Sequence, residues 1–302
     1  MTSSLPESLT FRPATPDDAE AVAELLRATE TALRGRSTVS ASDLLDTWRL
    51  IDLTNASWIV LDEDELIAGG MLITMREYGD FWGVVRPDAK GRGIGTALLD
   101  RAEEAARAAG KPGLHAGTMA EDRDAAALLT ARGYRDVRHY FTMVIDLDEA
   151  PQPAWPDGIR GDTVSYDEAE AFKDALDEAF EDEWGWEPMS FEEWKRLRLD
   201  ATSTDLGLWF VARDGDELAA VARCESGRWG GGWVGAIGVR PAWRRRGLGL
   251  ALLHHAFAEF HRRGERTVRL GVDTQNPTSA TRLYERASMR VESEDVVFER
   301  EL

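Results

Sequence analysis

The segment Val239–Leu253 reads VRPAWRRRGLGLALL, and the segment Val85–Leu99 reads VRPDAKGRGIGTALL. They share nine residues in register: the opening Val-Arg-Pro, one arginine, two glycines and the closing Ala-Leu-Leu. Each is followed by a helical pattern that ends at a glycine, Gly110 in the first copy and Gly264 in the second. The chain is therefore predicted to contain two copies of one structural unit.

The copies are separated by a segment rich in proline and acidic residues, DLDEAPQPAWPDG at 146–158. Such a composition is typical of a linker between domains. A chain of 302 residues is also long enough for two domains, each with its own core. We predict an N-terminal domain at 1–152 and a C-terminal domain at 153–302.

Periodicity and turn residues predict an alternation of strands and helices in the second copy. The predicted strands are 159–165, 208–213, 217–224, 233–239, 267–272 and 291–298, and the predicted helices are 167–180, 191–199, 248–263 and 277–286. The three strands from 208 to 239 suit an antiparallel meander. In the last helix Asn276 is the expected cap and Pro277 the expected first residue. The first copy repeats this order from Leu9 to Ile145.

The loop Arg244–Gly249 lies between a predicted strand and an amphipathic helix. Backbone N–H groups at a helix N-terminus bind anions, and the arginines add charge-assisted hydrogen bonds suited to a pyrophosphate. A Walker loop would need Gly-Lys-Ser/Thr at its end, where Leu250 and Ala251 follow, and a dinucleotide fingerprint would need glycine at Leu252. The spacing excludes both of these nucleotide-binding loops.

Arg244-x-x-Gly247-x-Gly249 resembles the acyl-CoA signature of the GNAT acetyltransferases, R/Q-x-x-G-x-G/A. A second block, NPTSATRLYERASM at 276–289, resembles the family's next motif, in which Asn caps a helix that ends in a Leu-Tyr pair. The resemblance covers both halves, and the tandem layout is similar to that of mycothiol synthase and related actinobacterial acetyltransferases. It implies an α/β (α+β) protein of two tandem GNAT folds, each a mixed, mostly antiparallel sheet flanked by helices.

The resemblance also implies an N-acetyltransferase that moves an acetyl group from acetyl-CoA to a primary amine of a small molecule. The amine attacks directly, in a V-shaped opening between the fourth and fifth strands. Tyr284 is the implied proton donor to the departing thiolate, and it assists rather than decides the reaction. The implied cofactor-binding residues are Ile237, Gly238, Val239, Arg244, Arg245, Arg246, Gly247, Leu248, Gly249, Leu250, Asn276 and Tyr284.

The acceptor amine must lose a proton before it attacks, because a lysine-like amine has a pKa of about 10 and is protonated at neutral pH. Mycothiol synthase has a glutamate on the strand with the oxyanion amides. The corresponding strand here reads GWVGAI at 232–237 and contains no carboxylate. The candidate bases are Glu183 and Glu187, in a loop that the family places over the acceptor pocket, and Glu225 on the preceding strand. Trp184 and Trp186 with these acids suit a cationic, partly apolar amine, so Trp184, Trp186 and Glu225 are the expected substrate-binding residues.

The first copy keeps Lys90-x-x-Gly93-x-Gly95 but has Leu129 where Tyr284 falls and Glu121 near the Asn276 position. It therefore lacks the proton donor. We predict that the first copy is degenerate and serves as a scaffold, a dimer surface or a lid. The chain is expected to be a monomer or a homodimer.

A formal charge of -19 argues against nucleic acid as a partner. The sequence has no long apolar run, no secretory signal at its start and one cysteine, Cys224, which predicts a soluble cytoplasmic protein that does not bind membranes. Abundant alanine, with arginine favoured over lysine, is typical of a GC-rich bacterial genome. The five histidines share no ligand spacing, so no metal is expected.

Three other functions fit these residues. One is a protein or peptide N-acetyltransferase, and another is a mycothiol synthase-like enzyme, which the missing strand glutamate disfavours. The third is an acyl-CoA-binding module without catalysis, which Tyr284 and the intact second loop disfavour.

Overall fold

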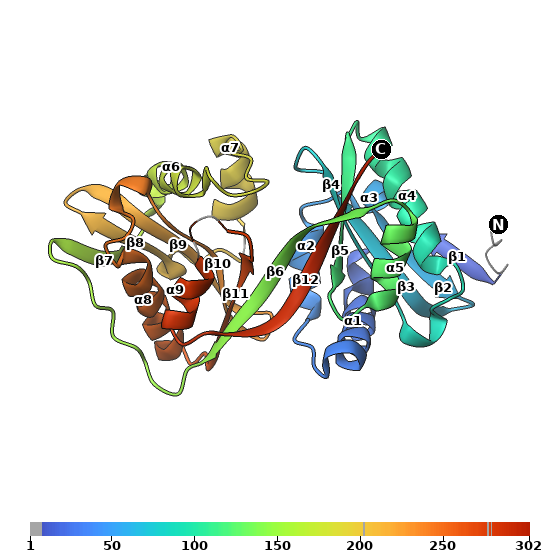
Figure 1. Cartoon of the computed structure of the whole chain (residues 1–302), viewed down its shortest axis with the longest axis horizontal. Coiled ribbons are helices and arrows are strands. Elements are labelled where there is room, and N and C mark those ends of the chain that lie inside the picture. Colours follow the sequence, from blue (N-terminus) through green and yellow to red (C-terminus); the bar gives the residue numbers. More distant parts are fainter. Residues whose placement is uncertain (1–7, 202, 277, 279) are drawn as a thin grey trace. The chain divides into compact units, whose positions relative to one another are not determined.

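The computed structural model describes residues 8–201, 203–276, 278 and 280–302. The chain divides into two compact units (Figure 1): unit 1 takes the residues up to His139 together with Glu294–Leu302, and unit 2 takes Tyr140–Ser293. Each unit is a mixed, mostly antiparallel sheet flanked by helices, which confirms the predicted fold class. No helix within the described ranges is long and apolar enough to cross a membrane.

Unit 2 has the sheet order β7-β8-β9-β10-β11-β6, in which only the pair β10–β11 is parallel. The predicted meander is confirmed, because β8, β9 and β10 pair antiparallel in succession. The elements from residue 135 to the end of the chain are β6 Arg135–Asp146, β7 Ile159–Thr163, η3 Tyr166–Glu168, α6 Ala169–Phe180, α7 Phe191–Trp194, η4 Lys195–Leu199, η5 Leu206–Leu208, β8 Trp209–Asp214, β9 Glu217–Arg228, β10 Gly231–Val239, η6 Pro241–Trp243, α8 Leu248–Arg262, β11 Thr267–Asp273, α9 Ala280–Arg286 and β12 Arg290–Glu301, the last of which joins the sheet of unit 1.

Two apolar clusters cover the two faces of the unit 2 sheet. α8 and α9 pack on one face, and the predicted stripe of α8 is fully buried there, namely Leu252, Leu253, Ala256, Phe257 and Phe260. α6 and α7 pack on the other face around Phe172, Trp194 and Trp209. The predicted helix at 191–199 is α7 followed by a π-helical turn, η4. Pro277, the predicted first residue of the last helix, lies outside the described residues.

Unit 1 has the sheet order β1-β2-β3-β4-β5-β12, with the pair β4–β5 parallel. Its elements repeat those of unit 2 in order. They are β1 Leu9–Arg12, η1 Pro16–Asp18, α1 Ala19–Arg34, α2 Ala41–Trp48, α3 Leu53–Ala56, β2 Ser57–Asp62, β3 Glu65–Ile73, β4 Gly79–Val85, η2 Pro87–Ala89, α4 Ile94–Ala108, β5 Gly113–Met119 and α5 Arg123–Ala131.

The two halves of the chain exchange their last strands. Residues 140–146 of β6 pair with β11 of unit 2, and residues 295–301 of β12 pair with β5 of unit 1. Val296 and Phe298 of β12 are buried in the core of unit 1, as Met143 of β6 is in the core of unit 2. The linear boundaries 1–152 and 153–302 do not anticipate this exchange, because each final strand has the same β pattern whichever sheet it joins.

Charged side chains of β12 are paired within unit 1. The Arg34 guanidinium contacts the Asp295 carboxylate at 2.6 Å, and His139 hydrogen-bonds Glu294 and Asp136. His115 lies between Asp80 and Glu299, at 3.4 and 3.2 Å. The exchanged strand is therefore held by ion pairs as well as by its apolar side chains.

We predict that unit 1 loses stability as pH rises above about 6.5, the ordinary histidine pKa. Burial lowers the pKa of His115, but its bonds to Asp80 and Glu299 outweigh burial and raise it overall; Glu294 and Asp136 raise the pKa of His139. A histidine whose pKa is higher in the folded state than in the unfolded state stabilises the fold at pH values below its unfolded-state pKa. This stabilisation is lost as the pH rises through the folded-state pKa. Thermal melts from pH 5.5 to 8.5 should fall less steeply in His115→Gln than in the parent; parallel curves would contradict the prediction.

Candidate active site

The parallel strands β10 and β11 separate at their C-terminal ends. Their pairing runs from Gly232 opposite Val268 to Val234 opposite Leu270 and stops there. β11 continues to Asp273 along β6, while β10 continues to Val239 along β9, after a bulge between Val234 and Ala236. The predicted opening between these strands is thus present in unit 2.

Two backbone amides of β10 face this opening. The N–H of Arg240 donates to the Ala219 carbonyl of β9. Because N–H direction alternates along a strand, the amides of Ile237 and Val239 point away from β9. No described residue of β11 lies in register with either residue. Both amides can therefore donate to a group that enters between the strands.

The predicted phosphate loop connects β10 to α8 through η6. Arg245 has φ of 65° and Gly247 has φ of 88°, and Gly247 caps α8 without a side-chain hydrogen bond. The first hydrogen bond of α8 that closes on Gly247 comes from Ala251, which leaves the amides of Leu248, Gly249 and Leu250 without intrahelical partners. A left-handed glycine thus turns the chain so that a helix of 15 residues presents open amides and its positive dipole end.

Two glycines at this site have packing roles that the sequence alone does not distinguish. A Cβ on Gly249 would lie 3.0 Å from Leu283, so α8 and α9 meet at this residue. A Cβ on Gly238 would lie 2.6 Å from Ala179, so the end of α6 packs directly on the β10 backbone. Both keep the helices close to the opening.

The three loop arginines differ in their surroundings. The Arg244 guanidinium donates to the carbonyls of Val239 and Ala179 at 3.2 Å and pairs with Asp182 at 3.0 Å. Arg246 pairs with Asp214 at 3.5 Å. Arg245 is exposed, and its guanidinium makes no hydrogen bond or ion pair with another described residue. Arg245 is thus the cation most accessible to an anion, while Arg244 braces the loop against α6.

Tyr284, Glu183 and Asn276 come together beside the opening. Tyr284 is buried on α9, and burial with the nearby Glu183 charge raises the pKa of its phenol. The Asn276 amide donates to the Glu183 carboxylate. Burial and Asp273 raise the pKa of Glu183, against the opposing effects of Asn276 and Arg244. These three predicted residues form one cluster with a carboxylate suited to taking up a proton.

The other predicted residues lie farther along the α6–α7 face or its loop. Glu225 pairs with Arg223 and Arg228, directly across from Trp233 of β10. Trp186 packs on Phe180 at 4.8 Å between ring centroids, and its buried indole N–H has no hydrogen-bond partner among the described residues. Trp184 is half-buried and Glu187 is exposed. Glu225 is thus held in ion pairs with two arginines, whereas the Glu183 carboxylate accepts a hydrogen bond from Asn276.

Three further residues shape the site without a sequence signal. Asp182 anchors Arg244, Asp273 raises the pKa of Glu183, and the Arg223 guanidinium lies over the β10 bulge, 2.9 Å from the position of a Gly235 Cβ. The only local hint for the first two is their position, one at the end of a helix and one at the end of a strand. Folding, rather than spacing along the chain, brings them to the opening.

Unit 1 differs from unit 2 at the positions of the tyrosine and of the first loop cation. Leu129 occupies the Tyr284 position, because Tyr134 N–H donates to Leu129 as Met289 N–H donates to Tyr284. The loop lysine, Lys90, pairs with Asp122 and Asp124 at 2.7 and 3.7 Å.

The opening of unit 1 is also more closed than that of unit 2. The β4–β5 pairing reaches Trp82 opposite Gly117, and a Gly117 Cβ would lie 2.5 Å from the Trp82 ring. Its loop cation is thus neutralised, and an aromatic ring lies across the strands.

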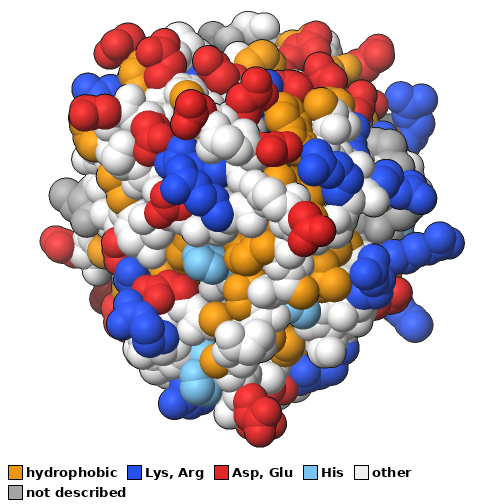
Figure 2. Space-filling model, turned by 90° about the vertical axis from the view of Figure 1, so that its left-hand side faces the viewer, with side chains coloured by type: hydrophobic (Ala, Val, Ile, Leu, Met, Phe, Trp, Pro, Cys, Tyr) orange, Lys and Arg blue, Asp and Glu red, His pale blue; other side chains and the backbone are white. Residues whose placement is uncertain are grey.

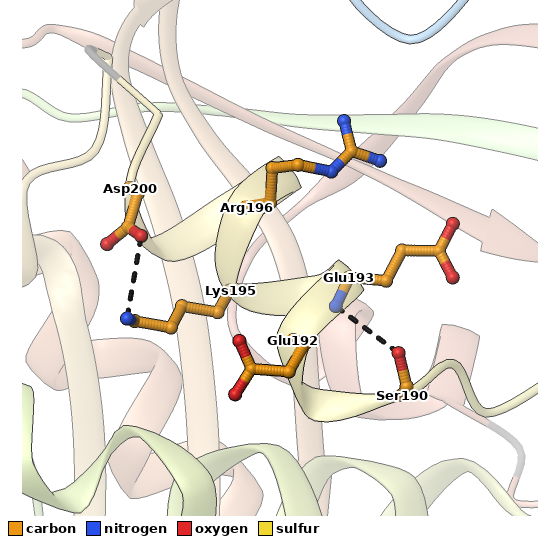
Figure 3. A pocket seen from close by; sticks show the side chains of 6 residues that line it. All are labelled: Ser190, Glu192, Glu193, Lys195, Arg196 and Asp200. Atoms are coloured by element: carbon orange, nitrogen blue, oxygen red, sulfur yellow. Dashed lines mark hydrogen bonds and ion pairs between the residues drawn. The ribbon is translucent and has the colours of Figure 1, made fainter.

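A surface pocket of 490 Å³ lies along α7 and η4 (Figure 3), away from the opening. Lys195 and Asp200 face each other across it at 3.8 Å, and the Ser190 hydroxyl caps the Glu193 N–H. Its lining residues are Ser190, Glu192, Glu193, Lys195, Arg196 and Asp200. None of these residues is a predicted site residue.

An opening between parallel strands, beside the open amides of a helix N-terminus and a buried tyrosine, is the arrangement expected of an acyltransferase. Comparison with known families agrees: the model of the acetyltransferase (GNAT) family matches the chain twice, at 19–134 and 169–289. The chain belongs to the GNAT acetyltransferase family, as a tandem protein with one family domain in each half.

Curated relatives carry the name mycothiol acetyltransferase. The protein of Catenulispora acidiphila is 32% identical over 226 residues, which span 72% of this chain and 70% of the relative. That of Thermobispora bispora is 29% identical over 293 residues, covering 95% of this chain and 97% of the relative.

Among solved structures, the GCN5-related N-acetyltransferase from Sphaerobacter thermophilus superposes with a TM-score of 0.87 at 33% identity, covering 99% of this chain and 97% of that one. A tandem GNAT protein from the clavulanic acid biosynthesis pathway has a TM-score of 0.73 at 18% identity, over 97% of this chain and 98% of that one. The second likeness shows the fold alone.

Proposed function

We propose that this enzyme is an N-acetyltransferase that moves an acetyl group from acetyl-CoA to the primary amine of a small molecule, with 153–302 as its catalytic domain. The observation that carries the proposal is the meeting, in unit 2, of two open β10 amides with the Tyr284–Glu183–Asn276 cluster. Unit 1 has Leu129 at the position of Tyr284 and Gly91 at the position of the exposed Arg245.

Acetyl-CoA supplies the activated acetyl thioester. The amides of Leu248, Gly249 and Leu250 and the exposed Arg245 suit its pyrophosphate, because they combine open donors with positive charge. The amides of Ile237 and Val239 suit the carbonyl oxygen, where negative charge develops as the amine attacks. One such donor contributes about 3 kcal/mol to catalysis.

Glu183 accepts the proton of the attacking amine. Its raised pKa brings a carboxylate closer to the operating pH, which favours a general base. Tyr284 stays protonated because its pKa is raised, so it can donate to the departing thiolate. The parent thiol has a pKa of about 8.5, so the thiolate departs readily even without a proton donor. Tyr284 is therefore an assisting group.

A cationic acceptor fits the charge around α6 and α7. Residues 165–200 contain thirteen acidic and four basic side chains. Figure 2 shows acidic side chains gathered along the top of the view, the side on which Figure 1 places α6 and α7. A surface of one sign raises the local concentration of oppositely charged ligands, so this region favours amines in their ammonium form.

Tyr284→Phe is predicted to lower kcat by about 10-fold without abolishing turnover, because the ring is kept and only the proton donor is lost. Tyr284→Leu, which copies Leu129 of unit 1, should lose more, since it also leaves a cavity on α9. Steady-state rates of CoA release with a fixed acceptor measure both. A Tyr284→Phe enzyme with unchanged kcat would remove Tyr284 from the mechanism.

The proposal is tested by a screen for CoA release with polyamines, aminoglycosides, amino acids and peptides. Release that depends on a small amine, with the acetylated product identified by mass, supports it. Turnover of peptides alone would instead indicate a peptide N-acetyltransferase. Acetyl-CoA binding without turnover of any acceptor would indicate a binding module.

A mycothiol-type acceptor is the second candidate. The names of the curated relatives favour it. Strand 232–237 lacks a carboxylate, but Glu225 lies directly across from Trp233 on the neighbouring strand. Adding the desacetyl form of mycothiol to the screen separates this candidate from other amines.

A further inference from the structure

We propose that Asn276 is a positioning residue that directs the Glu183 carboxylate and tunes its basicity. This inference rests on the proposed function, in which Glu183 is the general base. The family resemblance groups Asn276 with the residues that bind acyl-CoA, whereas its side-chain amide donates a hydrogen bond to Glu183.

The side-chain amide of Asn276 has only one orientation that satisfies its neighbours. Its Oδ1 accepts the Thr278 N–H at 2.7 Å and the Thr278 hydroxyl at 2.5 Å. Its Nδ2 therefore faces the other way and donates to Glu183. An amide flip would place an oxygen against the carboxylate and a donor against the Thr278 N–H, so the turn before α9 fixes the donor toward Glu183.

The loop that carries Glu183 is held at two adjacent residues. Asp182 pairs with Arg244 of the phosphate loop, and Glu183 is bound by Asn276. Asp273, at the end of β11, repels the Glu183 charge, and its own carboxylate accepts the Gln275 N–H at 2.8 Å. Asn276 thus keeps a carboxylate in place beside a second one, which would otherwise push it away.

Unit 1 provides an independent view of this junction. The turn before α5 corresponds to the turn before α9, since Leu128 packs on Gly95 as Leu283 packs on Gly249. There Glu121 receives the Arg34 guanidinium from the end of α1, at 3.0 Å. In both units this turn holds a charged side chain from the C-terminal end of the first long helix or the loop just after it. That side chain is Arg34 in unit 1 and the carboxylate of Glu183 in unit 2.

Asn276→Ser separates positioning from a merely structural role. Serine can still cap the turn, because its hydroxyl accepts a backbone N–H, but it cannot reach Glu183 with a donor. Carbon-13 NMR titration of the glutamate carboxyls measures the pKa of Glu183 in the absence of any acceptor amine. The Glu183 signal is assigned by its loss in Glu183→Gln. We expect Asn276→Ser to raise the pKa of Glu183 by about half a unit to one unit, and Asn276→Asp to raise it further.

Activity provides the second measurement. The acid limb of the pH–rate profile should move upward by the same amount in Asn276→Ser, with acetyl-CoA affinity unchanged by calorimetry. In the Glu183→Gln background the Asn276→Ser change should add no further loss of rate. Thermal melts of each variant identify any general loss of folding.

An unchanged Glu183 titration in Asn276→Ser, or a loss confined to acetyl-CoA affinity, would overturn the inference and return Asn276 to the cofactor site. The proposed function fails in a different way: Glu183 titrates as described, Asn276 shifts it, and no amine is turned over.

Discussion

Gly247→Asp is expected to weaken acetyl-CoA binding by about 100-fold, which corresponds to roughly 2.7 kcal/mol. The substitution places a negative charge at the open N-terminus of α8, where the amides of Leu248, Gly249 and Leu250 face outward. That charge competes with a pyrophosphate for the same donors and for the helix dipole. Calorimetry with acetyl-CoA measures the loss, and the parent should bind one acetyl-CoA per chain.

Unit 1 offers a matched control for this variant. Gly93 caps α4 with φ of 81°, nearly the same backbone as Gly247 at 88°. Gly93→Asp therefore introduces equal strain and equal charge at the corresponding loop of unit 1, and acetyl-CoA affinity should remain unchanged. Gly247→Asn, which tolerates the left-handed conformation without the charge, should lose less than Gly247→Asp. Equal losses in Gly93→Asp and Gly247→Asp would refute the assignment of binding to unit 2.

Glu183→Gln is expected to lower kcat/KM by about 100- to 1,000-fold, the range that a general base contributes. The substituted amide can still accept the Asn276 hydrogen bond through its oxygen, so the loop should keep its place and acetyl-CoA affinity should change little. Rate rises as pH passes upward through the Glu183 pKa in the parent, because the base must be ionised. That acid limb should disappear in the variant.

Two acids of the same region serve as controls for Glu183→Gln. Glu187 is exposed on the same loop, and Glu225 is paired with Arg223 and Arg228. Glu187→Gln should leave the pH–rate profile unchanged, and Glu225→Gln should affect KM for the acceptor more than the acid limb. If the acid limb disappears in Glu225→Gln and remains in Glu183→Gln, then Glu225, the strand neighbour of Trp233, is the general base in place of Glu183.

Local patterns along the chain were sufficient to predict the duplication, the order of strands and helices, and the loop between a strand and a helix at 244–249, whose binding of phosphate stays a prediction. Each depends on short-range physics: the stripe of Leu252, Leu253 and Phe257 requires one buried helix face, and Gly247 permits the left-handed turn before it. Tyr284 was implied by the family resemblance, whose second motif lies in one helix, and its role as proton donor stays a prediction. Pro277 falls outside the described residues and stays a prediction.

Only tertiary structure decided which strands pair and which charges meet. The alternation in β6 and β12 suits either sheet, so the exchange of last strands depends on the cores that receive Met143 and Val296. Glu183 and Asn276 are separated by most of a domain, and the Asp182–Arg244 pair fixes the loop that joins them. A sequence records the residue types that chemistry requires, but the pKa of a carboxylate depends on its burial and on the charges around it, and both exist only in the folded chain.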